Sequence, residues 1–138
     1  MNGEKIHMKS VAMIQNRAYI DIKTGNHIPA QVLIQIVDHD MDFPTPAKEF
    51  KYTYQYKFWD DKDSFTDAMA RDMTSILLKH LTFGHSVVVH CVAGLCRSGA
   101  VAEVGTIIGY KDTGARRIPN VDVKIRLLKA LDSEYYYE

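Results

Sequence analysis

The first half of the chain alternates between apolar blocks and turn residues, and these blocks have the short period of β-strands. Residues 8–22 are apolar with interruptions and predict one or two short strands around the segment 15–17. The apolar block at 32–37 predicts a buried strand. Residues 51–58 place an aromatic side chain at every second position, which predicts a strand with one buried face.

In the second half, apolar residues recur every three or four positions, as is typical of helices. Residues 64–81 predict a helix with a suitable N-cap in Ser64. The run 87–89 predicts a short central strand, an Ala- and Gly-rich helix follows at 98–110, and Asn120 is suited to cap a last helix. This order predicts an α/β fold with a central, mostly parallel sheet of about four to five strands flanked by helices.

Size and charge narrow the classes of function. The 138 residues are expected to form one domain, 1–138. Seventeen basic and seventeen acidic side chains cancel, so no basic field favours a nucleic-acid partner. The absence of a long apolar run or a signal-peptide pattern, together with only two cysteines, predicts a cytoplasmic protein without a membrane partner. No pattern fixes an oligomeric state.

The chemistry of the chain concentrates in a turn between the strand at 87–89 and the following helix. Cys91 lies in this turn, and five residues separate it from Arg97. Backbone N–H groups at a helix N-terminus bind anions, and the same positive environment favours a thiolate nucleophile. An arginine guanidinium fits two phosphate oxygens at once. The turn therefore indicates a site that holds a phosphate dianion against a thiolate.

Five residue types in this turn form a recognisable signature, His90-Cys91-x-x-Gly94-x-x-Arg97-Ser98. It resembles the phosphate-binding signature of the cysteine-dependent protein tyrosine phosphatase superfamily, and the small size suggests the compact dual-specificity-like branch. The resemblance is sharp from about residue 58 to 105, architectural before that and weak after 110. It implies a protein-tyrosine-phosphatase-like fold and a metal-independent phosphomonoesterase that works through a phosphocysteine and needs no cofactor.

The resemblance also implies a role for each residue of the turn. Cys91 would be the nucleophile, and Arg97 would clamp two phosphate oxygens. Gly94 would permit the tight backbone path, Ser98 would stabilise the departing thiolate, and His90 would orient the loop. The backbone amides that would cradle the phosphate belong to Val92, Ala93, Gly94, Leu95, Cys96 and Arg97.

A general acid is also needed, because an aryl or alkyl oxide leaves poorly without a proton. The family uses an aspartate on a mobile loop, roughly thirty residues before the cysteine. Asp60 and Asp61 both fit this spacing, with Asp60 preferred and Asp63 a more distant third. The same carboxylate would then activate water as a base for the second step.

The charge of the side chains inside the loop indicates which class of substrate the site would accept. Relatives that act on phosphoinositides or RNA 5′-phosphates tend to carry basic residues there, whereas the five positions between Cys91 and Arg97 are uncharged. This favours phosphotyrosine proteins, with phosphoserine or phosphothreonine as an extension. The alternatives are a non-protein phosphate ester, a phosphate-binding module without turnover and, through Cys96, a sulfur-transfer or arsenate-reducing role.

Cys96 departs from the small polar residue expected at its position. It either fills space beneath the loop or captures an oxidised Cys91 as a disulfide, and the tight loop favours the first interpretation. The other histidines show no metal-ligand spacing, and no metal site is predicted.

Overall fold

A computed structural model of the chain describes residues 11–137. Its centre is one sheet in the order β3-β2-β4-β1-β5, and every neighbouring pair of strands is parallel. This confirms the predicted α/β class. The strands are β1 (Met13–Arg17), β2 (Val32–Val37), β3 (Tyr52–Lys57), β4 (Val87–His90) and β5 (Lys111–Asp112). The helices are α2 (Tyr19–Thr24), α3 (Asp67–Thr82), α4 (Arg97–Ile108) and α5 (Val121–Tyr137).

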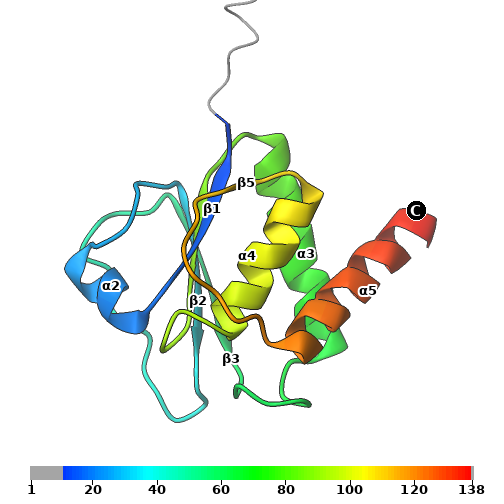
Figure 1. Cartoon of the computed structure of the whole chain (residues 1–138), viewed down its shortest axis with the longest axis horizontal. Helices are drawn as coiled ribbons and strands as arrows, with labels where there is room; N and C mark the ends of the chain where they lie inside the picture. Colours follow the sequence, from blue (N-terminus) through cyan, green and yellow to red (C-terminus); the bar gives the residue numbers. More distant parts are fainter. Residues whose placement is uncertain (1–10, 138) are drawn as a thin grey trace, which may run out of the picture.

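The two faces of the sheet carry unequal layers. Figure 1 shows α3, α4 and α5 on one side of the sheet and the short α2 on the other. The thin layer is a small cluster in which Ile22 of α2 packs with Leu33 and Val88. The thick layer holds the main core, which includes Ile34, Val89 and side chains from all three long helices. Every residue of β2 is buried, as the apolar block predicts.

The edge strand β3 shows the predicted alternation. Tyr54 and Tyr56 pack toward the main core, whereas Thr53 and Gln55 are exposed. The tyrosine hydroxyls find polar partners on α3, because a phenol buried without one would be unfavourable. Tyr56 donates to the carboxylate of Asp72 at 2.6 Å. The aromatic stripe is therefore sheet core.

The N-terminal segment contains one strand, within the expected one or two, and a helix that was not predicted. The strand is β1 and the helix is α2; residues 8–10 lie outside the described residues. The carboxylate of Asp21 accepts the backbone N–H of Ala18 at 3.0 Å and starts the helix. Gly25, with φ of +76°, ends it in the left-handed region. A helix this short leaves little periodic signal in a sequence.

The start of α3 also differs from the prediction. The helix begins at Asp67, and its N-cap is Thr66, whose hydroxyl accepts the N–H of Met69 at 3.1 Å. Ser64 instead accepts the N–H of Trp59 at 2.8 Å and closes the acidic loop on itself. Both residues are good caps by type, so only the tertiary structure chooses between them.

The remaining helices follow the prediction closely. Helix α4 starts at Arg97, one residue early, directly after the cysteine turn. Asn120 caps α5, because its Oδ1 accepts the N–H of Val123 at 3.1 Å. Strand β5 was not predicted, since two residues are too few to show a period. Within the described residues, no helix is long and apolar enough to cross a membrane. The cysteine turn thus lies at the carboxyl edge of a parallel sheet, where α/β proteins bind ligands.

Candidate active site

The sulfur of Cys91 is surrounded by hydrogen-bonding groups of its own loop. The Ser98 hydroxyl lies 3.1 Å from the sulfur, and the backbone N–H of Gly94 donates to it at 3.3 Å. Cys91 is 2% exposed and Ser98 is completely buried. The loop at 91–96 precedes the N-terminus of α4, whose unpaired N–H groups favour negative charge. The structure therefore places an amide, a hydroxyl and a helix N-terminus around one thiol.

Gly94 lets the loop approach the end of β1. Its φ is +79°, in the left-handed region that favours glycine. A Cβ at this position would lie 2.6 Å from the backbone nitrogen of Ala18 and 2.6 Å from the carbonyl carbon of Arg17. Because both neighbours are backbone atoms, neither can move aside cheaply. The tight path that the resemblance implied therefore has a steric cause in the β1–α2 junction.

Strand β1 supports the loop from below. The side-chain amide of Asn16, which is buried, donates to the carbonyls of Gly94 at 2.7 Å and Arg116 at 2.9 Å. The N–H of Tyr19 donates to the carbonyl of Val92 at 3.0 Å. Sequence reasoning missed Asn16, although a polar amide inside an otherwise apolar strand is the signal that could have found it.

Arg97 is held in place by the residues that directly follow strands β2 and β3. Its Nη1 donates to Oδ1 of Asp38 at 2.8 Å and to the carbonyl of Phe58 at 2.5 Å. Arg97 is only 4% exposed, so its guanidinium is oriented before any ligand arrives. Nη1 makes both of these hydrogen bonds, whereas the buried Nε has no hydrogen-bond partner among the described residues.

Asp38 is a site residue that the sequence analysis did not find. It follows directly after β2, at the same edge of the sheet as the cysteine turn. Its carboxylate is 27% exposed and forms an ion pair with Arg97. An acidic residue at the carboxyl end of a buried parallel strand was the available signal. Its role depends on strands β2 and β4 being neighbours, which the local sequence does not state.

His90 lies fully buried beneath the loop. Its Nδ1 is 3.1 Å from the carbonyl oxygen of Cys91, and the Tyr19 ring stands edge-on to it. Burial lowers the pKa of His90 to about 4, with the nearby Arg97 charge acting in the same direction. The imidazole is therefore neutral near pH 7, and its Nδ1–H donates to the carbonyl. This geometry suits a residue that orients the loop.

The structure separates the two leading aspartates. Oδ1 of Asp60 accepts the side-chain amide of Asn120 at 2.7 Å, and its carboxylate lies beside the Cys96 thiol. Asp61 instead caps its own turn, because its Oδ1 accepts the N–H groups of Asp63 at 3.1 Å and Ser64 at 2.9 Å. Asp60 is thus the aspartate that borders the cysteine loop.

Cys96 has the surroundings of a protonated thiol. Burial raises its pKa, and the charges of Asp60 and Cys91 act in the same direction. Both cysteines are free in the structure. A raised thiol pKa is compatible with the favoured space-filling interpretation, and nothing in the structure tests the alternative of a disulfide with Cys91.

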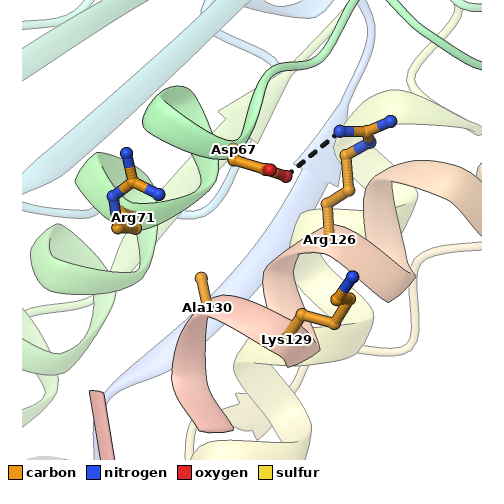
Figure 2. A pocket seen from close by; sticks show the side chains of 5 residues that line it. All are labelled: Asp67, Arg71, Arg126, Lys129 and Ala130. Atoms are coloured by element: carbon orange, nitrogen blue, oxygen red, sulfur yellow. Dashed lines mark hydrogen bonds and ion pairs between the residues drawn. The ribbon is translucent and has the colours of Figure 1, made fainter. Parts of the chain in front are cut away.

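A hollow lies apart from the cysteine loop. It occupies about 170 Å³ between α3 and α5, and Figure 2 shows the ion pair of Asp67 with Arg126 across its mouth, 3.1 Å long. The lining residues are Asp67, Arg71, Arg126, Lys129 and Ala130. None of them belongs to the loop at 91–97. Across residues 11–137, no three His, Cys, Asp or Glu side chains gather as ligands for a metal ion.

The sequence profile of the protein-tyrosine phosphatase family matches residues 8–129. The chain belongs to this family. The match includes the first strand and most of α5, so the family resemblance extends further in both directions than the motif alone suggested. No curated protein sequence matches the chain.

Solved structures share the fold of this chain, and they include phosphatases of the dual-specificity type. Human DUSP28 superposes with a TM-score of 0.63 and 13% identity over 91% of this chain and 95% of that one. The human tyrosine phosphatase-like serine/threonine/tyrosine-interacting protein gives 0.59 and 15% over 88% and 92%. OH1 from Orf virus, described as a tyrosine phosphatase with triple substrate specificity, gives 0.53 and 14% over 88% of each chain. At these identities the likeness shows a shared fold.

Proposed function

We propose that this protein-tyrosine phosphatase domain hydrolyses phosphate monoesters on proteins through a phosphocysteine, without a metal ion or cofactor. The observation that carries the proposal is the set of donors at the Cys91 sulfur: the Ser98 hydroxyl lies 3.1 Å away and the backbone N–H of Gly94 donates at 3.3 Å, directly before the helix that begins with the buried Arg97. A nucleophile and positive donors arranged in advance are what phosphoryl transfer requires. A free thiol nucleophile needs a reducing compartment, which supports a cytoplasmic location.

In the first step, the Cys91 thiolate attacks phosphorus and the bond from phosphorus to the leaving oxygen breaks. Arg97 and the loop amides bind the three equatorial oxygens and stabilise the charge that builds up there. Asp60 donates its proton to the leaving oxygen, so the products are a phosphocysteine and a neutral phenol or alcohol. These fixed positive donors supply the charge that a metal ion supplies in other phosphatases.

In the second step, water attacks the phosphocysteine. The Asp60 carboxylate takes a proton from the water, the phosphorus–sulfur bond breaks, and inorganic phosphate leaves. The sulfur departs as a thiolate, which the Ser98 hydroxyl stabilises by donating a hydrogen bond across the 3.1 Å contact. His90 keeps the loop carbonyl of Cys91 in place throughout.

Phosphotyrosine is the substrate that the site supports best, with phosphoserine and phosphothreonine as an extension. Two apolar side chains of the cysteine loop and of the loop around Asp60 are exposed: Val92 is 38% exposed, and Trp59, next to Asp60 in the chain, is 41% exposed. Such groups suit an aromatic ring better than a polyanionic headgroup. The loop side chains between Cys91 and Arg97 add no positive charge, which argues against phosphoinositides and RNA 5′-phosphates.

The test is hydrolysis of p-nitrophenyl phosphate and of a phosphotyrosine peptide in the presence of EDTA. We expect turnover in the wild type and none in Cys91→Ser. Asp60→Asn should lower kcat on the peptide by about 100-fold, because general acid catalysis contributes roughly that factor, and Asp61→Asn should lower it only a few-fold. A folded, reduced wild type that binds phosphate without turnover would overturn the proposal in favour of a binding module.

A further inference from the structure

We propose that Asn120, the residue before α5, positions the general acid relative to the cysteine loop. The inference rests on the proposed function and adds a residue that neither the motif nor the family match identifies. Asn120 lies 29 positions after Cys91 in the chain but joins three separate segments: the cysteine loop, the acid loop at 59–66 and the last helix. In Figure 1, the loop before α3 and the start of α5 meet at the lower edge of the molecule.

All hydrogen-bonding groups of Asn120 are used. Its backbone N–H donates to the carbonyl of Cys96 at 2.9 Å, and its backbone carbonyl accepts the N–H of Lys124 at 3.1 Å. Its Oδ1 caps α5 by accepting the N–H of Val123. Its Nδ2 donates to Oδ1 of Asp60 at 2.7 Å and, more weakly, to the carbonyl of Asp61 at 3.4 Å. The cap and the contact with the acid are therefore made by different atoms of one amide.

Capping a helix does not require an amide donor. Serine, threonine and aspartate cap as well as asparagine, because a cap needs only a side-chain oxygen. The Nδ2 of Asn120 provides something beyond the cap, a neutral donor aimed at a carboxylate oxygen. A serine at this position would keep the acceptor but would be too short to reach Asp60 at the same time.

The acid depends on this contact because its own loop does not orient it. The bonds within residues 59–66 run from Trp59 to Ser64 and from Ser64 to Asp61, so they close the turn without touching the Asp60 carboxylate. Asp60 is exposed, and its other described neighbour is the Cys96 thiol, a weak donor. Asn120 therefore ties the acid to the carbonyl of Cys96 through a single residue.

A residue that positions an acid has a kinetic signature. Proton donation matters most when the leaving group is a poor one, such as phenol or tyrosine, and least for p-nitrophenol. Misplacing Asp60 should therefore slow phenyl phosphate and phosphotyrosine peptide selectively. Loss of folded protein, or damage to the cysteine loop, would slow all three substrates by the same factor.

The experiment compares Asn120→Ser with wild type on phenyl phosphate and p-nitrophenyl phosphate. We expect kcat on phenyl phosphate to fall about tenfold, a part of the full contribution of an acid, and kcat on p-nitrophenyl phosphate to fall less than about threefold. KM and the urea unfolding midpoint should stay near wild type, because serine preserves the cap. Asn26→Ser is the matched control, since it also removes an exposed Asn–Asp hydrogen bond, to Asp21.

The double variant Asn120→Ser/Asp60→Asn shows whether the residue acts through the acid. If it does, Asn120→Ser has no further effect once Asp60 is replaced. Equal losses on both substrates, or multiplicative losses in the double variant, would overturn the inference while leaving the proposed function intact. If Asp60→Asn itself shows no dependence on the leaving group, the assignment of the acid fails, and the inference fails with it.

Discussion

The cysteine loop and the acid loop differ sharply in how they are held. In the cysteine loop, Cys91, Arg97 and the following Ser98 are at most 4% exposed, and the end of β1 supports them from beneath. In the acid loop, Asp60 and Asp61 are exposed, and side-chain hydrogen bonds close the turn. Packing fixes Cys91, the proposed nucleophile, whereas a few exchangeable contacts fix Asp60, the proposed acid. Substitutions in the first loop should therefore reduce stability and activity together, and substitutions in the second should reduce mainly the rate.

Replacing Gly94 by alanine should have the largest effect. The left-handed backbone costs a non-glycine residue roughly 1–2 kcal/mol, and the new Cβ would also collide with the backbone of residues 17 and 18. We expect Gly94→Ala to lose more than about 2 kcal/mol of unfolding free energy and at least about 100-fold in kcat/KM. Urea unfolding and p-nitrophenyl phosphate hydrolysis measure the two losses.

Gly114 is the matched control, because its φ is +83° but nothing lies within 4 Å of a Cβ there. Gly114→Ala should lose only about 1 kcal/mol and keep its activity. If the two alanine variants behaved alike, close approach to β1 would not be what requires glycine at position 94.

Removing the charge of Asp38 should have the second-largest effect on stability and activity. Asp38→Asn leaves the buried Arg97 guanidinium without its anionic partner, at a cost of roughly 1–2 kcal/mol in unfolding free energy. A less firmly oriented guanidinium should lower kcat/KM roughly 10-fold. The same two assays apply, and Asp40→Asn, two residues away and exposed, is the control. Equal behaviour of the two variants would show that the ion pair does not orient Arg97.

The protein should lose stability at acid pH, because two of its fully buried side chains are histidines. Burial lowers the pKa of both His80 and His90 to about 4, from an ordinary value of 6.5. Between these values the unfolded chain binds more protons than the folded one, so stability rises with pH and is lost as pH falls from 6.5 toward 4. The slope is at most about 1.4 kcal/mol per pH unit for each histidine.

Urea unfolding at a series of pH values across this window tests the expectation. His80→Gln should flatten the curve without changing the site, because His80 lies on α3 and contacts Tyr54 and His85. A curve that stays steep in this variant would assign the dependence to other groups.

The smallest effect is expected for Ser64→Ala. This change removes the acceptor of the Trp59 N–H, a hydrogen bond worth about 1 kcal/mol, in an exposed loop. We expect a two- to fivefold loss of kcat on phosphotyrosine peptide, no change on p-nitrophenyl phosphate and almost unchanged unfolding, given the small contribution of the acid to good leaving groups. Ser75→Ala, on the exposed face of α3, should be silent. A large loss of stability would mean that the acid loop is as firmly packed as the cysteine loop.

Residues that are neighbours in the sequence were predictable, and residues brought together by topology were not. Cys91, Arg97 and Ser98 share one turn, so their spacing alone indicated the phosphate site. Asp38 joins that site only because β2 lies next to β4, and Asn16 only because β1 lies on the other side of β4. The order of the strands in the sheet cannot be predicted from the pattern of residues within any one strand.

The sequence also could not determine which of two nearby, chemically similar residues takes a given role. Ser64 and Thr66 are both suitable caps, but the Ser64 hydroxyl accepts the N–H of Trp59 within the acid loop, and Thr66 caps α3. Asp60 and Asp61 fit the same spacing, and the structure distinguishes them because the Asp61 carboxylate caps its own turn whereas the Asp60 carboxylate contacts Asn120. Spacing narrowed the candidate acid to two residues, and the hydrogen bond that Asp60 accepts comes from a side chain sixty positions away.

The place of β1 in the sheet has a consequence for how the protein is made. This first strand pairs with β4 on one side and with β5, at residues 111–112, on the other. The ribosome must therefore synthesise the chain past residue 112 before β1 finds both partners, and past residue 116 before the Asn16 amide finds both of the carbonyls that it contacts. We expect slow, all-or-none folding dominated by distant contacts, in which nascent chains that stop before residue 111 cannot protect the reactive cysteine.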